Sequence, residues 1–88
     1  MPERTEVMRS TAGRDKGTLL AAVGVQDGSV LVADGRRRPL SRPKKKNPRH
    51  MVPTDMTLPE EALGSDRALR RALRRAADLI GNDVVSDE

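Results

Sequence analysis

The most distinctive chemistry in this 88-residue chain lies in a basic segment at residues 35–50, which reads GRRRPLSRPKKKNPRH. It carries eight Lys or Arg side chains and no carboxylate. Pro39, Pro43 and Pro48 remove backbone donors and favour extended backbone over helix. Each cation that reaches a phosphate releases condensed counterions, so a row of them favours binding to a polyanion. The alternatives are an ordinary charged surface, a disordered solubilising run and, for the three lysines, a targeting signal.

Charge is unevenly distributed along the chain. Residues 1–57 hold twelve Lys or Arg and six Asp or Glu, whereas residues 58–88 hold five and seven. This division predicts a basic body that faces a polyanion and a solvated acidic tail at residues 83–88. The first ten residues lack the apolar stretch of a signal peptide, and no run approaches transmembrane length, which predicts a soluble cytoplasmic protein.

Catalytic constellations are missing from the sequence. The stretch GRDKGT superficially resembles a phosphate-binding loop, but three residues instead of four separate Gly13 from Gly17, and no Lys stands between Gly17 and Thr18, so the spacing is wrong. His50 is the single histidine and there is no cysteine, which leaves no catalytic triad and no nitrogen or sulfur metal cluster. We therefore expect no enzyme, no metal and no cofactor. His50 itself is more typical of a strand edge than of a group that stacks on bases.

The first half of the chain predicts a mainly β structure. A short strand at residues 7–10 leads into a loop at 11–18, and two Asp-Gly pairs, Asp27-Gly28 and Asp34-Gly35, indicate hairpin turns. We expect a three-stranded meander whose third strand spans residues 36–40, a bend or bulge at Gly24, and a last short strand near residues 50–52. One apolar face is predicted to hold Leu19, Ala21, Val23, Val25, Val30 and Val32. These elements favour a small SH3-like antiparallel barrel over residues 5–55.

The remainder predicts a helical extension over residues 56–82. Thr57 and Glu60 fit a capping box, Ser65 can cap a second, longer helix, and Gly81 is the expected stop. The longer helix carries one apolar stripe, formed by Leu69, Ala72, Leu73, Ala76 and Ile80. Its other faces carry Arg67, Arg70, Arg71, Arg74 and Arg75. Three interpretations of these arginines are open: they are simply solvated, they contact RNA, or they bind a membrane or a partner helix.

Nucleic acid is the polyanion that the composition favours, and RNA more than DNA. The sequence has no Phe, Trp or Tyr, so it offers no platform on which single-stranded bases could stack. Recognition is then expected to depend on shape and on the phosphate backbone. Folded RNA, with its phosphate ridges and 2′-hydroxyls, suits an extended basic segment better than the major groove of B-DNA, which admits a helix or a two-stranded ribbon.

Two stretches carry a resemblance to a known family. The sequence STAGRDKG, followed by two apolar strands and then VLVADGRRRPLSRPKKKNPRHM, resembles KOW-domain RNA-binding proteins over about residues 5–54. More narrowly, it is similar to small bacterial stand-alone KOW proteins that are related to the archaeal and eukaryotic large-subunit ribosomal proteins of the group numbered fourteen-e. Gly17 takes the place of the KOW glycine. The extension after Asp55 lies outside the resemblance.

The resemblance implies an SH3-like barrel that contacts structured ribosomal RNA or the large ribosomal subunit and performs no catalysis. The expected RNA-contacting residues combine the loop at 11–18 with the basic segment: Arg14, Lys16, Arg36, Arg37, Arg38, Arg42, Lys44, Lys45, Lys46 and Arg49. The alternative function is a protein-interaction adaptor, in which the barrel is a scaffold and the C-terminal helix docks a protein partner through Leu69, Leu73 and Ile80.

Overall fold

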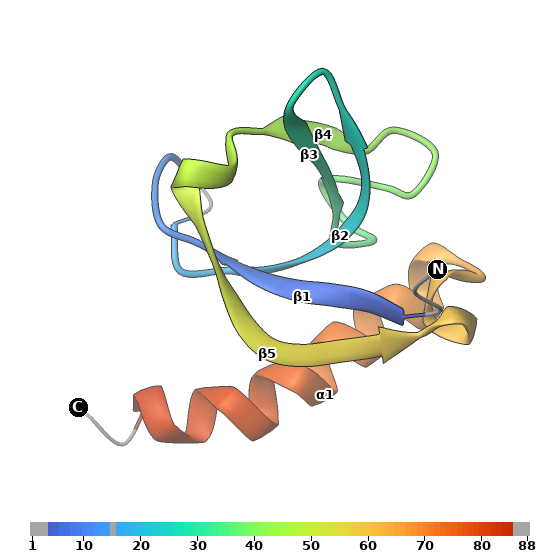
Figure 1. Ribbon diagram of the computed structural model, residues 1–88. Helices are drawn as coiled ribbons and strands as arrows, with labels where there is room; N and C mark the ends of the chain where they lie inside the picture. The colour runs from blue at the N-terminus through green and yellow to red at the C-terminus, as the bar shows by residue number, and fades with distance from the viewer. Residues whose placement is uncertain (1–3, 15, 86–88) are drawn as a thin grey trace.

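The computed structural model describes residues 4–14 and 16–85 (Figure 1). Five antiparallel strands form one sheet: β1 (Arg4–Ser10), β2 (Leu19–Gln26), β3 (Ser29–Ala33), β4 (Lys44–Lys46) and β5 (Met51–Pro59). Two short 3₁₀ helices, η1 (Pro48–His50) and η2 (Glu60–Leu63), precede and follow β5, and the chain continues into α1 (Asp66–Val85). The prediction of a mainly β structure followed by a C-terminal helix is confirmed.

The sheet has the strand order β4-β3-β2-β1-β5. It is strongly curved, with β3 and β4 at the top of Figure 1, β1 and β5 below them, and α1 at the bottom. Within residues 4–14 and 16–85 there is no pairing between β4 and β5. No helix in this part of the chain is long and apolar enough to cross a membrane.

The first Asp-Gly pair forms the hairpin turn that the sequence predicts. Asp27 and Gly28 both have positive φ, 53° and 81°, and connect β2 directly to β3. Two consecutive residues with positive φ are the requirement of a type I′ turn, whose twist matches that of the flanking strands. The irregularity expected at Gly24 is also present, because the register of β2 against β3 shifts between Ala22 and Gly24.

The second Asp-Gly pair does not form a hairpin, and the strand predicted at residues 36–40 is wrong. The third strand of the meander is instead β4, which pairs Lys44 with Val32 and Lys46 with Val30. The reason is local: the Asp34 side chain accepts hydrogen bonds from the backbone of the residues that follow it, which closes residues 34–38 into a loop.

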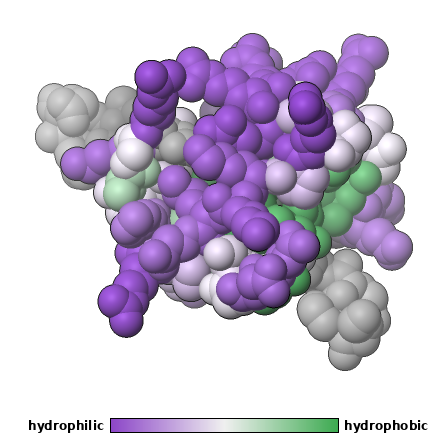
Figure 2. All heavy atoms as spheres, turned by 90° about the horizontal axis from the view of Figure 1, so that it is seen from above, coloured by the Kyte–Doolittle hydropathy of each residue, from purple (hydrophilic) through white to green (hydrophobic). Residues whose placement is uncertain are grey.

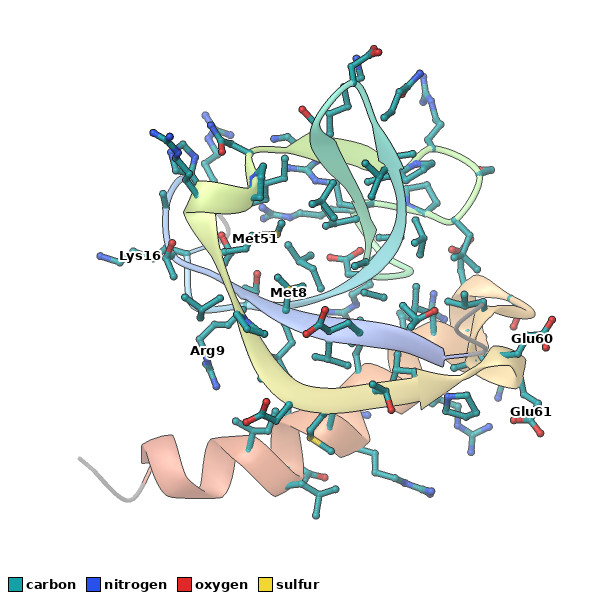
Figure 3. All side chains as sticks on the ribbon, in the orientation of Figure 1. Met8, Arg9, Lys16, Met51, Glu60 and Glu61 are labelled. Carbon is teal, nitrogen blue, oxygen red and sulfur yellow. The ribbon has the colours of Figure 1, made fainter. Side chains whose placement is uncertain are left out.

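The prediction of one apolar face is also wrong, because both faces of the curved sheet bury apolar side chains. Under α1 lies a cluster that includes Val7, Ala21 and Leu69. On the opposite face Leu20, Val32 and Met51 form a second cluster, with Met8 packed against it; Figure 3 shows Met8 and Met51 inside the curve of the sheet. Val30 and Val32 therefore point away from Ala21.

The bulge in β2 explains the position of Val25, which was predicted to share the face of Ala21. After the bulge Val25 pairs with Val30, which points away from Ala21, so Val25 lies on the other face of the sheet. Its side chain is 75% exposed near the tip of the hairpin.

The C-terminal region departs from its predicted boundaries. Thr57 lies in β5, where it pairs with Glu6 of β1, so it caps no helix. The strand β5 therefore crosses the domain boundary that was predicted at residue 55. Strand pairing over residues 51–59 outweighs the local capping signal. The longer helix starts where it was predicted, with the Ser65 hydroxyl accepting a hydrogen bond from the Ala68 N–H at 3.0 Å.

The other end of the helix was predicted too early. The backbone of α1 continues past Gly81 to Val85, so residues 83–85 of the predicted acidic tail belong to the helix. Residues 86–88 of that tail lie outside the described residues.

The apolar stripe of α1 packs on the sheet. Leu69, Leu73 and Ala76 are buried, and Leu69 and Leu73 belong to the cluster that contains Val7. The helix is therefore part of the folded unit. Leu69 and Leu73, which were expected to dock a protein partner, thus fill the core of their own chain.

Candidate nucleic-acid interface

The loop at residues 34–38 holds the first three arginines of the basic segment. The Asp34 Oδ1 atom accepts hydrogen bonds from the N–H groups of Arg36 at 2.8 Å and Arg38 at 2.9 Å. In return, the Arg38 carbonyl accepts from the N–H groups of Asp34 and Gly35. Gly35 has a φ of 81°, which costs glycine little and other residues much more. The loop is thus closed by its own backbone, and the side chains of Arg36 and Arg37 are exposed.

This loop is attached to the first turns of α1. The Arg70 Nη1 group donates to the Gly35 carbonyl at 2.8 Å, and the Leu40 N–H donates to Asp66 Oδ1 at 2.7 Å. Gly35 is buried against the helix: a Cβ at this position would lie 2.5 Å from the Asp66 carbonyl oxygen. We call this set of contacts, made by Asp34, Gly35, Leu40, Asp66 and Arg70, the loop–helix junction.

A groove of about 720 Å³ lies beside the junction, between α1, the start of β2 and residues 34–36. Six arginines line it, from β1, the loop and α1: Arg9, Arg36, Arg67, Arg70, Arg71 and Arg74. We call it the arginine groove. A second groove of about 600 Å³ shares Thr18, Asp34 and Arg36 with the first and adds Arg14, Arg37 and Arg38. The shared residues make the two grooves one continuous cationic surface.

The electrostatics of this surface favour an anionic ligand. Asp34 is the one acidic residue among the described side chains that line the two grooves, and its Oδ1 atom is occupied by backbone N–H groups. In Figure 3 the carboxylates of Glu60 and Glu61 are at the opposite end of the molecule from Arg9 and Lys16. Guanidinium groups bind phosphate oxygens through two parallel hydrogen bonds, so the surface is suited to phosphates.

The three consecutive lysines lie in β4, away from the arginine groove. Lys44 and Lys45 are exposed, and Lys45 Nζ lies 3.9 Å from Asp27 Oδ2 in an exposed ion pair of little energetic consequence. Figure 2 looks down on this side of the molecule and shows it largely covered by hydrophilic side chains.

Lys46 differs from its neighbours because its side chain is buried. It lies opposite Val30 in the pairing of β4 with β3, on the face that holds the second apolar cluster, and it is only 9% exposed. Its Nζ group donates to the Ala12 carbonyl at 3.3 Å, so its charge reaches the loop at 11–18 while its stem lies inward. As an expected phosphate contact, Lys46 is therefore poorly placed.

The remaining expected contact residues are exposed but spread over separate segments. Lys16 and Arg14 lie in the loop at 11–18, where Gly13 and Gly17 both have positive φ. Arg42 and Arg49 are exposed as well, and Arg49 is in η1. The side chain of His50 is exposed at the end of the same 3₁₀ helix, and its carbonyl accepts from the Thr11 N–H at 2.8 Å, which ties the loop to β5.

The structure therefore brings only part of the expected set together. Arg14, Arg36, Arg37 and Arg38 meet in the grooves, whereas Lys16, Arg42, Lys44, Lys45 and Arg49 lie outside their lining. Arg9 and the helix arginines that line the groove were not among the expected contact residues. A signal for the latter was present, because positions 67, 70, 71 and 74 are spaced as one stripe along a helix.

Neither metal chemistry nor a known family adds to this description. In the described ranges no group of three or more His, Cys, Asp or Glu side chains is arranged to hold a metal ion. No protein-family model matches the chain, and no curated protein matches it significantly.

Proposed function

We propose that this is a non-catalytic, cytoplasmic RNA-binding protein that binds structured RNA, with ribosomal RNA or the large ribosomal subunit as its principal partner. In this proposal the curved sheet is an SH3-like barrel of the KOW type, as the resemblance of residues 5–54 implies. The arginine groove and the adjoining second groove are the main contact surface.

The observation that carries the proposal is the convergence of arginines from distant parts of the sequence. Arg9 comes from β1, Arg14 from the loop at 11–18, Arg36 from the loop at 34–38 and Arg74 from α1, yet all four line the two connected grooves. A solvated surface needs no such convergence, because interspersed charges keep a protein soluble equally well. A concave surface lined by guanidinium groups concentrates positive potential where a phosphate backbone can enter.

Structured RNA fits this surface better than single strands do. Single-strand binding proteins stack bases on aromatic rings, and this chain has none. Double-helical and folded RNA is recognised mostly through phosphates and 2′-hydroxyls, for which arginine is the best-suited side chain.

Sedimentation of a host lysate tests the partner. The proposal expects the protein to move with large ribosomal subunits at low and moderate salt, and to return to the top of the gradient after ribonuclease treatment. A protein that stays at the top in every condition does not bind ribosomes. A fast-sedimenting complex that survives ribonuclease would indicate a protein partner, as the adaptor function requires.

Two neighbouring arginines of α1 provide a matched test of the surface. Arg74 lines the arginine groove, whereas Arg75, which is also exposed, does not. Arg74→Gln and Arg75→Gln change the net charge by the same amount. The proposal expects Arg74→Gln to weaken binding to a purified RNA hairpin clearly more than Arg75→Gln. Equal effects would show that net charge alone drives binding and that the groove is not the contact surface.

A further inference from the structure

Two carboxylates stand at the edge of the cationic surface. Asp34 lines both grooves, and Asp66 lies at the start of α1 within the loop–helix junction. By Coulomb's law, a negative charge beside an anion-binding surface opposes binding. Charge alone therefore predicts that removal of either carboxylate raises the affinity for RNA.

The hydrogen bonds of these carboxylates suggest the opposite. Asp34 Oδ1 accepts from the backbone of Arg36 and Arg38, and Asp66 Oδ1 accepts from the backbone of Leu40. These three hydrogen bonds hold the backbone at Arg36, Arg38 and Leu40, and so restrain the segment that carries the three loop arginines. Without them the loop keeps the backbone hydrogen bonds to the Arg38 carbonyl and the bond between Arg70 and Gly35, but the backbone N–H groups of Arg36 and Leu40 lose their acceptors.

The contact between loop and helix is also too close to allow much adjustment. A Cβ on Gly35 would lie 2.9 Å from Arg70 Cγ as well as 2.5 Å from the Asp66 carbonyl oxygen. The Arg70 guanidinium, which lines the groove, is itself bonded to the Gly35 carbonyl. The junction therefore fixes the loop arginines relative to the helix arginines.

We propose that Asp34 and Asp66 are positioning residues that preorganise the RNA-binding arginines, so that loss of their acceptor oxygens weakens RNA binding even though it also removes a negative charge. The inference rests on the proposed function. Its physical basis is that an ordered loop loses less conformational entropy when RNA binds. The two carboxylates thus have a structural role at an anion-binding surface, because their oxygens accept hydrogen bonds from the backbone that carries the arginines.

Alanine and asparagine substitutions separate the two effects at each position. Asp34→Asn and Asp66→Asn remove the charge but keep an Oδ1 acceptor, whereas Asp34→Ala and Asp66→Ala remove both. With a short RNA hairpin as probe, we expect the Asn variants to bind as well as the wild type or up to about threefold more tightly. The Ala variants should bind roughly three- to tenfold more weakly. Ala variants that bind RNA as tightly as the wild type, or more tightly, would overturn the inference.

Hydrogen exchange in the absence of RNA gives a second, independent readout. The amides of Arg36 and Arg38 should exchange faster in Asp34→Ala, and that of Leu40 should exchange faster in Asp66→Ala, while β2 and β3 keep their protection. Unchanged exchange at these amides would overturn the positioning role even if affinity fell. A wild-type protein that binds no RNA would instead overturn the proposed function, and exchange would then decide separately whether the aspartates order the loop.

Discussion

Single residues with similar sequence surroundings have different roles in this protein. Gly28 and Gly35 each follow an aspartate and have the same φ of 81°, but Gly28 has open space around it and Gly35 lies against the backbone of α1. Lys44 and Lys46 are two positions apart, yet one is exposed and the other is buried. In both pairs tertiary contacts, which residue type and spacing do not reveal, decide the role.

The glycine pair predicts a difference in stability. Gly28→Ala should lower the free energy of unfolding by about 1 kcal/mol, because only the positive φ opposes a side chain there. Gly35→Ala adds a collision between the new Cβ and the Asp66 carbonyl oxygen. It should therefore lower the free energy of unfolding by about 2 kcal/mol more than Gly28→Ala does, which is in the range of overpacked cores. Urea denaturation of both variants measures the difference. Equal midpoints would contradict the close approach of the loop to α1.

The lysines predict a difference in reactivity. Brief acetylation of the free protein, read by mass spectrometry, should modify Lys16, Lys44 and Lys45 quickly and Lys46 slowly, since an amine must be exposed to react. Fast modification of Lys46 in the folded protein would show that its side chain is not held against Ala12. The same experiment with RNA present identifies which of the exposed lysines RNA covers.

At the level of the elements, α1 completes the fold. Its residues Leu69 and Leu73 pack with Val7 of β1, Ala21 of β2 and Leu58 of β5. The chain has no aromatic residue, so each buried Leu supplies a large share of the core volume. We therefore expect the sheet to depend on the helix for its stability.

Substitutions on two faces of α1 test this dependence. Leu69→Ala, at a side chain with 0% exposure, should lower the free energy of unfolding by about 2–5 kcal/mol through the cavity that it leaves. The control is Leu79→Ala, at a side chain that is 63% exposed, which should change it by less than about 0.5 kcal/mol. If thermal or urea unfolding were equally unaffected by both, the helix would be an appendage and not part of the core.

Several elements could be predicted from the sequence because their signals are local. The Asp27-Gly28 turn, the bulge near Gly24 and the start of α1 after Ser65 depend on a few neighbouring residues, and all three are present. The helix start at Thr57 was wrong because strand pairing distant in sequence determines this place. The strand predicted at 36–40 was wrong because the Asp34 side chain closes the loop locally and α1, distant in sequence, holds its far end. Leu40 bonds to Asp66, and Thr57 pairs with Glu6.

On the scale of the whole molecule, the fold assembles one cationic surface from pieces that the sequence keeps apart. Composition and the basic segment predict a polyanion partner, and Arg36, Arg37 and Arg38 of that segment line the grooves. Nothing in the local pattern could place Arg9 of β1 beside Arg71 of α1, since that proximity requires the helix to pack back on the sheet. The helix arginines thus line the same surface as the arginines of the loop.

The most direct test of the central claim is the salt dependence of binding to a purified RNA hairpin, measured for the wild type, Arg74→Gln and Arg75→Gln. A plot of the logarithm of the association constant against the logarithm of salt concentration should be linear and steep for the wild type, because each phosphate contact releases counterions. Loss of one such contact in Arg74→Gln should reduce the slope by about 0.7 to 1, and Arg75→Gln should leave it unchanged. A shallow wild-type slope, or equal slopes for the two variants, would contradict RNA binding in the arginine groove.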